Sequence, residues 1–314
     1  MRDLTPLINR LNKNHRHLAK WARRQDTECY RLYDRDIPEF PVIVDVYANS
    51  AHIQEVDTGW QMEDDEHAAW MLAIRQTVAD VLGIALDDTA IKTRRRQKGL
   101  AQYEKTGETG RERIVSETGR RFIVNLEAYL DTGLFLDHRN TRRLVGEQAA
   151  GKRFLNLFAY TGSFTVYAAT GGAASSVTVD LSNTYQDWSR RNFELNGLDL
   201  SRHTLVRADV FRYLEDAAAA GERFDLIVMD PPSFSNSKKM LDILDVQRDH
   251  VSLIDAAMAL LAPDGVLYFS NNLRGFKLEA ELGQRYLVDD LSAKSVPEDF
   301  RNRKIHQCFR LRAT

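Results

Sequence analysis

The first third of the chain changes from a helical to a strand-like pattern of apolar residues. Leu7, Leu11, Leu18 and Trp21 recur at helical spacing, which predicts a helix over residues 5–24. Short runs that alternate Val, Ile and Tyr with polar residues then predict strands, and an amphipathic stretch that ends at Gly83 predicts a second helix. The strands are expected at 28–33, 41–48, 51–56, 90–94 and 121–126, the second helix at 64–83, and a polar loop at 97–119.

From about residue 131, short apolar runs alternate with segments of helical length. This alternation predicts parallel strands joined by crossover helices, so the fold class is α/β, a doubly wound, Rossmann-like sheet of seven strands. No long helix separates the last two strands, which we expect to be antiparallel. The strands are expected at 154–158, 176–179, 204–207, 226–229, 266–270, 285–291 and 305–311, with helices beginning at Ser163, Thr184, Val210 and Val246.

The two patterns together predict three parts. Residues 1–26 form a basic N-terminal helix, residues 27–130 a small α+β accessory domain, and residues 131–314 the Rossmann-like domain.

Composition narrows the class of protein. The 314 residues are 43% apolar and 28% charged with a formal net charge of -2, which suits a globular protein and excludes a wholly basic nucleic-acid binder. Cys29 and Cys308 lie far apart without a CxxC or Cys-His cluster, so we expect neither a disulfide framework nor a metal. Without a long apolar run or a secretory signal, we expect a cytoplasmic protein that does not contact membranes.

The candidate chemistry lies where the parallel strands end, because ligands bind at the carboxyl ends of such strands. The first strand leads into the turn NLFAYTGS at 156–163. A turn of small residues that enters a helix lets backbone N–H groups approach a ligand closely. The turn lacks the GxGxxG pattern, which disfavours a dinucleotide and a nicotinamide dehydrogenase, and an ordinary strand–helix turn is the alternative.

Two acids follow the next two strands. Asp180 could accept hydrogen bonds from both hydroxyl groups of a ribose. Asp209 could accept from an adenine amino group, with the N–H of Val210 donating to the ring. Both aspartates also suit the N-cap of a following helix, and at Asp180 the two roles are compatible.

The most specific pattern is Asp230-Pro231-Pro232-Ser233-Phe234, directly after the fourth strand. Two consecutive prolines fix the backbone, and their carbonyl groups are not consumed by a continuing helix. Such a rigid turn, rich in acceptors, suits a planar nitrogenous base held by its edge, with Phe234 as a stacking face. The alternative is the start of an ordinary proline-rich loop.

Taken together, these four turns are similar to those of class I S-adenosylmethionine-dependent methyltransferases, and the Asp-Pro-Pro turn is typical of members that methylate nitrogen atoms. A closer resemblance covers nearly the whole chain, to the RlmK family, which forms the C-terminal half of the bifunctional RlmKL enzymes of 23S ribosomal RNA. The similar segments include 7–13 (LINRLNK), 29–38 (CYRLYDRDIP), 132–139 (TGLFLDHR), 154–162 (FLNLFAYTG), 178–182 (TVDLS), 224–239 (FDLIVMDPPSFSNSKK), 246–250 (VQRDH) and 269–276 (FSNNLRGF).

The resemblance implies that S-adenosylmethionine methylates N7 of a guanine in domain V of 23S ribosomal RNA, either free or in a large-subunit assembly intermediate. Guanine N7 has a lone pair and no proton, so positioning rather than a general base should supply most of the catalysis. Asp230 and the carbonyl groups of Pro231 and Pro232 would hold the base, and Phe234 or Tyr160 would cover its face. The bifunctional enzymes carry a THUMP domain and a second methyltransferase with its own turn, so we expect a stand-alone form without guanine-N2 activity.

The implied cofactor site also includes the segment before the first strand, which passes the methionine end of the cofactor in this fold. Phe135 is expected to pack there, with core packing as the alternative, and Arg139 to pair with the cofactor carboxylate. His138 is expected to be a structural or helix-start residue rather than a catalyst. The predicted cofactor-binding residues are Phe135, Arg139, Asn156, Phe158, Tyr160, Thr161, Gly162, Ser163, Asp180, Leu181, Ser182, Asp209, Val210 and Asp230.

Basic residues gather in two runs despite the balanced total charge. Residues 4–25 contain six basic residues and no acid, and residues 92–98 contain five basic residues. Because phosphate neutralisation dominates RNA affinity, both runs are candidate RNA contacts, with solvated surface as the alternative. The predicted RNA-binding residues are Arg10, Lys13, Arg16, Lys20, Arg94, Arg95, Arg96, Lys98, Lys238 and Lys239.

Two other functions stay open. A cytosine-C5 methyltransferase of 23S ribosomal RNA needs a cysteine thiolate to attack the pyrimidine ring. Neither Ser233 nor the end of the fifth strand at 270–272 provides one, and Cys308 falls in an apolar strand that predicts a buried, inert thiol. A non-catalytic RNA-binding assembly factor would be distinguished by its failure to bind the cofactor or to transfer the methyl group.

Overall fold

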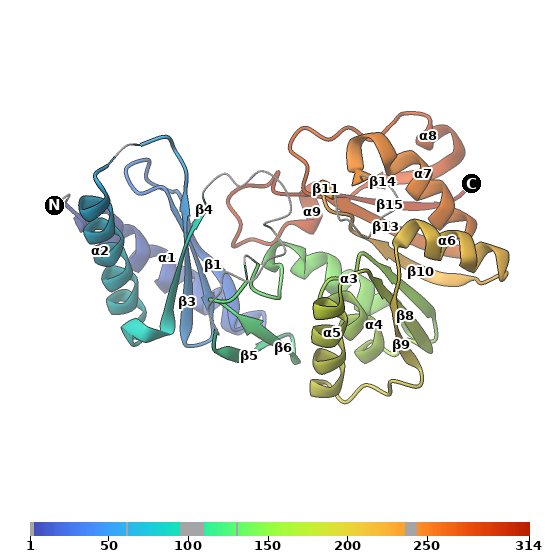
Figure 1. Cartoon of the computed structure of the whole chain (residues 1–314), viewed down its shortest axis with the longest axis horizontal. Helices are drawn as coiled ribbons and strands as arrows, with labels where there is room; N and C mark the ends of the chain where they lie inside the picture. The colour runs from blue at the N-terminus through green and yellow to red at the C-terminus, as the bar shows by residue number, and fades with distance from the viewer. Residues whose placement is uncertain (1–2, 61, 95–109, 130, 236–243) are drawn as a thin grey trace. The chain divides into compact units, whose positions relative to one another are not determined.

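The computed structural model describes residues 3–60, 62–94, 110–129, 131–235 and 244–314 (Figure 1). It divides into two compact units, Met1–Thr132 with Glu298–Arg301, and Gly133–Pro297 with Asn302–Thr314. Within the described ranges, no helix has the length and apolar character to cross a membrane.

The first unit is built on a four-stranded sheet of order β1-β2-β3-β4 in its described part. β1, β2 and β3 are antiparallel neighbours, whereas β3 and β4 are parallel because α2 crosses between them. Leu7, Leu11 and Trp21 of α1 are buried in the core of this unit, so the predicted N-terminal helix belongs to its core. The elements are α1 (Thr5–Arg24), β1 (Cys29–Asp34), β2 (Val42–Tyr47), β3 (Ser50–Val56), α2 (Asp64–Leu82), η1 (Leu86–Asp88) and β4 (Thr89–Arg94).

The first unit also contains a hairpin, half of which falls where the sequence predicted a loop. β5 (Glu112–Glu117) pairs antiparallel with β6 (Arg120–Asn125), so the predicted loop at 97–119 was wrong over the length of β5. The single fully buried apolar side chain of β5 is Val115. One inward apolar residue among charged neighbours is too weak a pattern to indicate a strand, and pairing with β6 supplies the rest of the signal.

The segment Glu298–Arg301 belongs to the first unit, although the sequence placed it in the second domain. The Asp299 carboxylate accepts a hydrogen bond from the backbone N–H of Arg31 (2.9 Å), and the Arg31 guanidinium lies 4.3 Å from the centre of the Phe300 ring. These contacts attach a short, sequence-distant segment to β1.

The second unit is a seven-stranded sheet of order β14-β15-β13-β10-β7-β8-β9 in the part of the chain described. The five strands from β13 to β9 are parallel, and β15 is antiparallel to both of its neighbours, as predicted for the last two strands. The strands are β7 (Arg153–Leu157), β8 (Ser175–Asp180), β9 (His203–Arg207), β10 (Phe224–Met229), β13 (Leu261–Asn271), β14 (Tyr286–Asp290) and β15 (Gln307–Ala313), beside a small pair β11 (Phe234–Ser235) and β12 (Leu244–Asp245).

Helices cover both faces of this sheet (Figure 1). On β10, Ile227 and Met229 pack with α6 and α7, while Leu226 and Val228 pack with α3 and α4, as alternation along a doubly buried strand requires. The helices are η3 (Leu136–His138), α3 (Arg139–Gln148), α4 (Ser163–Thr170), α5 (Asn183–Leu195), α6 (Val210–Ala219), α7 (Val246–Ala259), α8 (Leu282–Arg285) and α9 (Ser292–Ser295). The predicted α/β sheet is confirmed.

Candidate active site

Strand order places the candidate site at the carboxyl ends of β7 and β10. From β7 the chain continues to β8 and β9 on one side, and then returns to β10 on the other side of β7. A reversal of this kind opens a crevice outside the strand ends, where α/β proteins bind ligands. The predicted turns after β7 and β10 therefore lie at the switch point, and those after β8 and β9 follow along the same edge of the sheet.

The turn after β7 has an unusual backbone. Phe158, Tyr160 and Gly162 have φ of 55°, 53° and 72°, and non-glycine residues with positive φ cost about 1–3 kcal/mol each unless the surroundings impose them. Gly162 also has no room for a side chain, because a Cβ would lie 2.8 Å from the Phe193 ring. The glycine predicted from sequence is thus required both by conformation and by close packing against α5.

Side chains of α5 hold this turn in place. The Ser189 hydroxyl donates to the Tyr160 carbonyl (3.0 Å), and the Asn192 amide donates to the Thr161 carbonyl (2.9 Å). Both side chains are almost fully buried. Neither residue was predicted from the sequence, although polar residues at i and i+3 on the inner face of an amphipathic helix are a signal that could have indicated them.

Asp180, at the end of β8, is bound by backbone groups. Its Oδ1 accepts from Ser182 N (2.8 Å) and its Oδ2 accepts from Tyr160 N (2.9 Å). Burial raises the pKa of this carboxyl to about 6, against the lowering effect of the two backbone hydrogen bonds. Each carboxylate oxygen has a further lone pair, so the group is a rigid acceptor that can receive two hydroxyl donors.

The remaining predicted residues of these turns cap or begin helices. Ser182 is the N-cap of α5, and its hydroxyl accepts from Tyr185 N (3.4 Å). Asp209 is the N-cap of α6 and accepts from Arg212 N (3.2 Å), followed by Val210, which is buried as the first helical residue. The N-cap role that the sequence offered as an alternative for Asp209 is therefore present, and it uses one of the two carboxylate oxygens.

Asn156 and its neighbours support the turn from within. The Asn156 amide donates to the Thr165 hydroxyl (3.1 Å), and Asn156 itself is buried within β7. Ser163 begins α4 directly after Gly162. The carbonyl group of Leu181 accepts from Arg207 Nε (3.4 Å) at the neighbouring strand end.

The segment before β7 is tied to the same turn. The Thr161 hydroxyl donates to the Gly133 carbonyl (2.7 Å), and the buried Arg142 guanidinium donates to the Phe135 carbonyl (2.7 Å). The Phe135 ring lies 5.0 Å from the Tyr160 ring, centre to centre, and 38% of Phe135 remains exposed. Arg139 begins α3 and is buried, with 5% exposure.

The Asp230 turn follows β10 and presents its carboxylate to side chains. Asp230 Oδ1 accepts from the Ser270 hydroxyl (2.7 Å), and Oδ2 lies 3.5 Å from His138 Nε2. The Asp230 side chain is 25% exposed, and Phe234, two residues past the prolines, is 50% exposed. An accessible acceptor and an accessible aromatic face therefore lie within one short turn.

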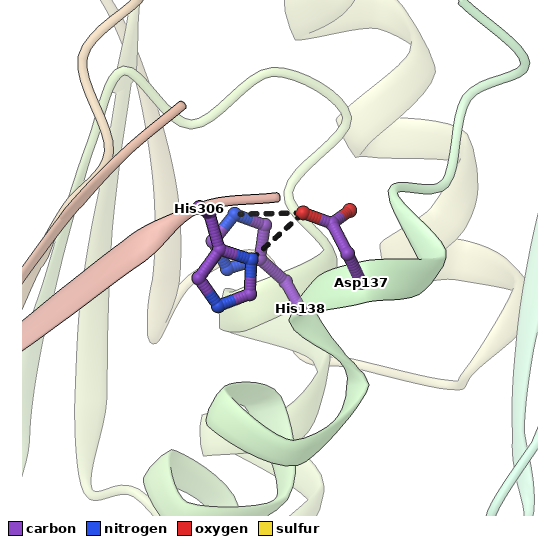
Figure 2. Close-up of side chains that lie close together, drawn as sticks. All are labelled: Asp137, His138 and His306. Carbon is purple, nitrogen blue, oxygen red and sulfur yellow. Dashed lines mark hydrogen bonds and ion pairs between the residues drawn. The ribbon is translucent and has the colours of Figure 1, made fainter. Parts of the chain in front are cut away.

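Two stacked histidines behind Asp230 were not predicted as a pair (Figure 2). The rings of His138 and His306 are 4.3 Å apart and nearly parallel, at 9°. His306 Nδ1 lies 2.8 Å from Asp137 Oδ2, and His306 Nε2 lies 2.8 Å from the Ser295 hydroxyl. The expectation that His138 is structural missed its approach to Asp230, because sequence separation hides the pairing.

Asp137, His138 and His306 place their nearest ligand atoms within 4.8 Å of one another, a spacing that a metal ion could use. Imidazole lone pairs lie in the ring plane, and one ion cannot lie in the planes of two stacked, parallel rings. The ring geometry therefore favours a hydrogen-bonded cluster over a metal site.

The polar and apolar groups of the site fit S-adenosylmethionine. Asp180 offers acceptors for the ribose hydroxyl groups, the Phe135–Tyr160 pair offers an apolar surface, and Asp209 keeps one carboxylate oxygen beyond its cap. A cationic sulfonium needs no phosphate-binding glycine loop, which agrees with a single glycine in the turn after β7.

The basic residues of α1 divide by exposure. Lys13, Arg16 and Lys20 are exposed, whereas Arg10 is partly buried, 3.8 Å from the Asp36 carboxylate. At 3.6 residues per turn, Lys13, Arg16, Lys20 and Arg24 fall within roughly a quarter of the helix circumference. The side chain of Arg94 and residues Arg95, Arg96, Lys98, Lys238 and Lys239 lie outside the described residues.

Comparison with known proteins identifies the family of this protein. A family model described as S-adenosylmethionine-dependent methyltransferase matches residues 76–298. The chain is 64% identical over 312 residues to ribosomal RNA large subunit methyltransferase K of Neisseria meningitidis serogroup B, covering 99% of this chain and 88% of the relative. It is also 52% identical over 305 residues to ribosomal RNA large subunit methyltransferase K/L of Chromohalobacter salexigens, covering 97% of this chain and 41% of that longer relative.

Solved structures share the fold. A crystal structure described as a methyltransferase complexed with SAH (S-adenosylhomocysteine) aligns with a TM-score of 0.77 and 26% identity, covering 99% of this chain and 82% of that chain. A structure from Streptococcus mutans, described as a SAM-dependent methyltransferase, aligns with a TM-score of 0.75 and 25% identity over the same shares.

Proposed function

The chain belongs to the S-adenosylmethionine-dependent methyltransferases and, among them, to the family of ribosomal RNA large subunit methyltransferase K, and we propose that it methylates N7 of a guanine in domain V of 23S ribosomal RNA. It is an enzyme that uses S-adenosylmethionine and acts on 23S ribosomal RNA. The chain spans 41% of the length of the K/L relative from Chromohalobacter salexigens, so the activities of that longer protein are not carried over as a whole. Free rRNA and a large-subunit assembly intermediate are both candidate substrates.

When bound, the cofactor supplies an electrophilic methyl group on a sulfonium. Asp180 would accept from its ribose hydroxyl groups, Asp209 and the N–H of Val210 would recognise its adenine, and Phe135 would cover its apolar part. Arg139 and the turn from Asn156 to Ser163, with Leu181 and the backbone N–H of Ser182 that donates to Asp180, would complete the site. The strained turn after β7 is held by the buried Ser189 and Asn192 side chains of α5, so the protein itself orders this part of the site.

The observation that carries the choice of a base nitrogen is the Asp230 turn, in which the Asp230 carboxylate is partly accessible and Phe234 is exposed. Guanine presents N1–H and an amino group on one edge, and a carboxylate with the Pro231 and Pro232 carbonyl groups is an acceptor set for those donors. Phe234 is exposed and can stack on the base. N7 has a lone pair and no proton, so these residues need only orient the base.

A cysteine mechanism has no support in the structure. Cys29 and Cys308 both have 0% exposure, and burial raises the pKa of the Cys308 thiol to about 12. A buried, protonated thiol is a poor nucleophile. This favours the nitrogen of guanine over C5 of cytosine.

The direct test is to identify the methylated nucleoside. Undermodified 23S ribosomal RNA is incubated with the enzyme and labelled S-adenosylmethionine, and N7-methylguanosine is expected; 5-methylcytidine or N2-methylguanosine would overturn the proposal. Asp230→Asn should lower methyl transfer roughly a hundredfold or more, because a misplaced base loses in-line geometry. Because Asp230 was also predicted to contact the cofactor, SAH affinity is measured for the same variant and should fall much less than the rate. Asp216→Asn, an exposed carboxylate on α6, serves as the matched control.

We propose that the exposed stripe Lys13, Arg16 and Lys20 binds the RNA backbone. Changing all three to Ala should weaken RNA binding for every sequence and flatten the dependence of log affinity on log salt by about two units. The same measurement on Arg143→Ala with Arg212→Ala, two exposed arginines of the second unit, is the control. An unchanged salt slope in the triple variant would exclude this helix from the interface.

A further inference from the structure

The Asp230 carboxylate cannot accept from the backbone of the two residues that follow it. An aspartate before a turn commonly accepts from the N–H two residues ahead, as Asp180 does from Ser182 N. Pro231 and Pro232 have no N–H, so this bond is impossible at Asp230. The structure instead surrounds the carboxylate with side chains from distant segments, Ser270 at the end of β13 and His138 at the end of η3.

The position of the proton on His138 follows from its neighbours. His138 Nε2 faces two carboxylates, with Asp230 Oδ2 at 3.5 Å and Asp137 Oδ2 at 3.8 Å. His138 Nδ1 is buried and has no hydrogen-bond partner among the described residues. A lone pair facing two carboxylates would be repelled, so we assign the N–H to Nε2, on the side of the two carboxylates, and the lone pair to Nδ1.

Burial is the main reason that the pKa of His138 is lowered. Burial lowers its pKa most; Asp230 raises the pKa, the stacked His306 lowers it, Asp137 raises it and Arg142 lowers it. The net direction is downward, so the ring is an uncharged N–H donor at neutral pH. A neutral donor can orient a carboxylate without neutralising its charge, and the carboxylate keeps its capacity to accept from a base.

The ring of His138 is itself fixed. It stacks on His306 and meets the Phe164 ring edge-on, with ring centres 5.8 Å apart. His306 is held in turn by Asp137 (Figure 2) and by the Ser295 hydroxyl. A ring held between two others cannot turn its Nε2 away from Asp230 without disturbing the packing of α4 and β15.

We propose that His138 is a positioning residue that, together with Ser270, holds the Asp230 carboxylate in the orientation that receives the target base. The inference rests on the proposed role of Asp230 in holding that base. His138 would act through Asp230 and would touch neither the base nor the cofactor.

The test compares amide and apolar replacements of His138. His138→Gln keeps a donor at about the position of Nε2, His138→Asn carries its donor at about the position of Nδ1, and His138→Leu has none. We expect kcat for methyl transfer to fall roughly tenfold or more in His138→Leu and in His138→Asn, and to recover to within about threefold of wild type in His138→Gln. SAH affinity, measured calorimetrically, should stay within about twofold in all three.

Two controls separate positioning from a structural role. His203→Leu removes a buried histidine whose ring contacts the Ser176 hydroxyl at the amino end of β9, away from the carboxyl ends of the strands. This variant should lower stability without lowering kcat. In an Asp230→Asn background, His138→Leu should lower the residual rate by less than about twofold, because the group it positions has been altered.

Each failure has a distinct meaning. Full activity in Asp230→Asn would overturn the proposed role of Asp230 itself. A strong Asp230→Asn effect with unchanged kcat in His138→Leu, or equal losses in His138→Gln and His138→Asn, would overturn positioning by His138 alone. If His138→Leu does not fold, the Gln and Asn variants still decide the question.

Discussion

Two aspartates follow the two strands that flank β7, and they are held in opposite ways. Asp180 after β8 accepts from two backbone N–H groups, whereas Asp230 after β10 is approached by two side chains. The residues after Asp180 are Leu181 and Ser182, which have N–H groups, and the residues after Asp230 are prolines, which have none. The two prolines therefore remove the local backbone donor that Asp180 has in Ser182, and side chains of distant segments approach Asp230 instead.

The difference matches the tasks that we propose for the two groups. A ribose is common to every cofactor molecule, so a carboxylate fixed by the backbone suits it. The substrate base has to be placed in line with the methyl group, and side-chain partners can be adjusted one by one to set that placement. The variants below test the comparison in order of expected effect.

Asp180→Asn should cause the largest change in cofactor binding. The amide can keep one accepting oxygen, but its NH₂ group then faces a backbone N–H, and one acceptor for ribose is lost. We expect SAH affinity to fall about 10- to 100-fold in a calorimetric titration. If this variant binds SAH with wild-type affinity, the Asp180 carboxylate has no role in binding the cofactor, and the proposed difference between the two aspartates is wrong.

Acidic pH should have an intermediate effect that is specific to Asp180. Burial raises the pKa of Asp180 to about 6, so lowering the pH protonates this carboxyl and removes an acceptor. If binding requires the ionised form, the dissociation constant for SAH should rise roughly tenfold between pH 7.5 and pH 5, one unit below that pKa. The dissociation constant of Asp180→Asn should change little over the same range, and a parallel rise in both proteins would assign the effect to another group.

How far the sequence predicts the site depends on where the partners come from. The positions of Asp180 and Asp230 follow from strand ends, and strand–helix alternation predicts a parallel sheet. The strand order that brings the two aspartates to both sides of β7 is seen only in the structure. The Ser182 partner is local, two residues away, and is therefore visible in sequence. His138 and His306 belong to segments that meet only in the folded sheet, and no short-range pattern marks them.

The first unit shows the same limit. The burial of Leu7 and Trp21 opposite an exposed basic stripe follows from helical periodicity alone. The strand β5 was missed because its evidence lies in its partner β6, and the attachment of Asp299 to Arg31 was missed because nearly the whole chain separates them. Pairing between distant segments is what a single sequence leaves undetermined.

The smallest expected effect gives the sharpest form of the comparison, because it uses the same substitution at both sites. Ser270→Ala removes the hydroxyl that donates to Asp230 Oδ1 (2.7 Å), and kcat should fall about fivefold, the usual value of one such hydrogen bond. Ser182→Ala leaves the backbone N–H that donates to Asp180 in place, so SAH affinity should stay within about twofold. Its only expected cost is the lost helix cap, about 1 kcal/mol in thermal or denaturant unfolding. If Ser182→Ala weakens the cofactor as much as Ser270→Ala slows transfer, backbone and side-chain support are equivalent and the distinction between the two aspartates fails.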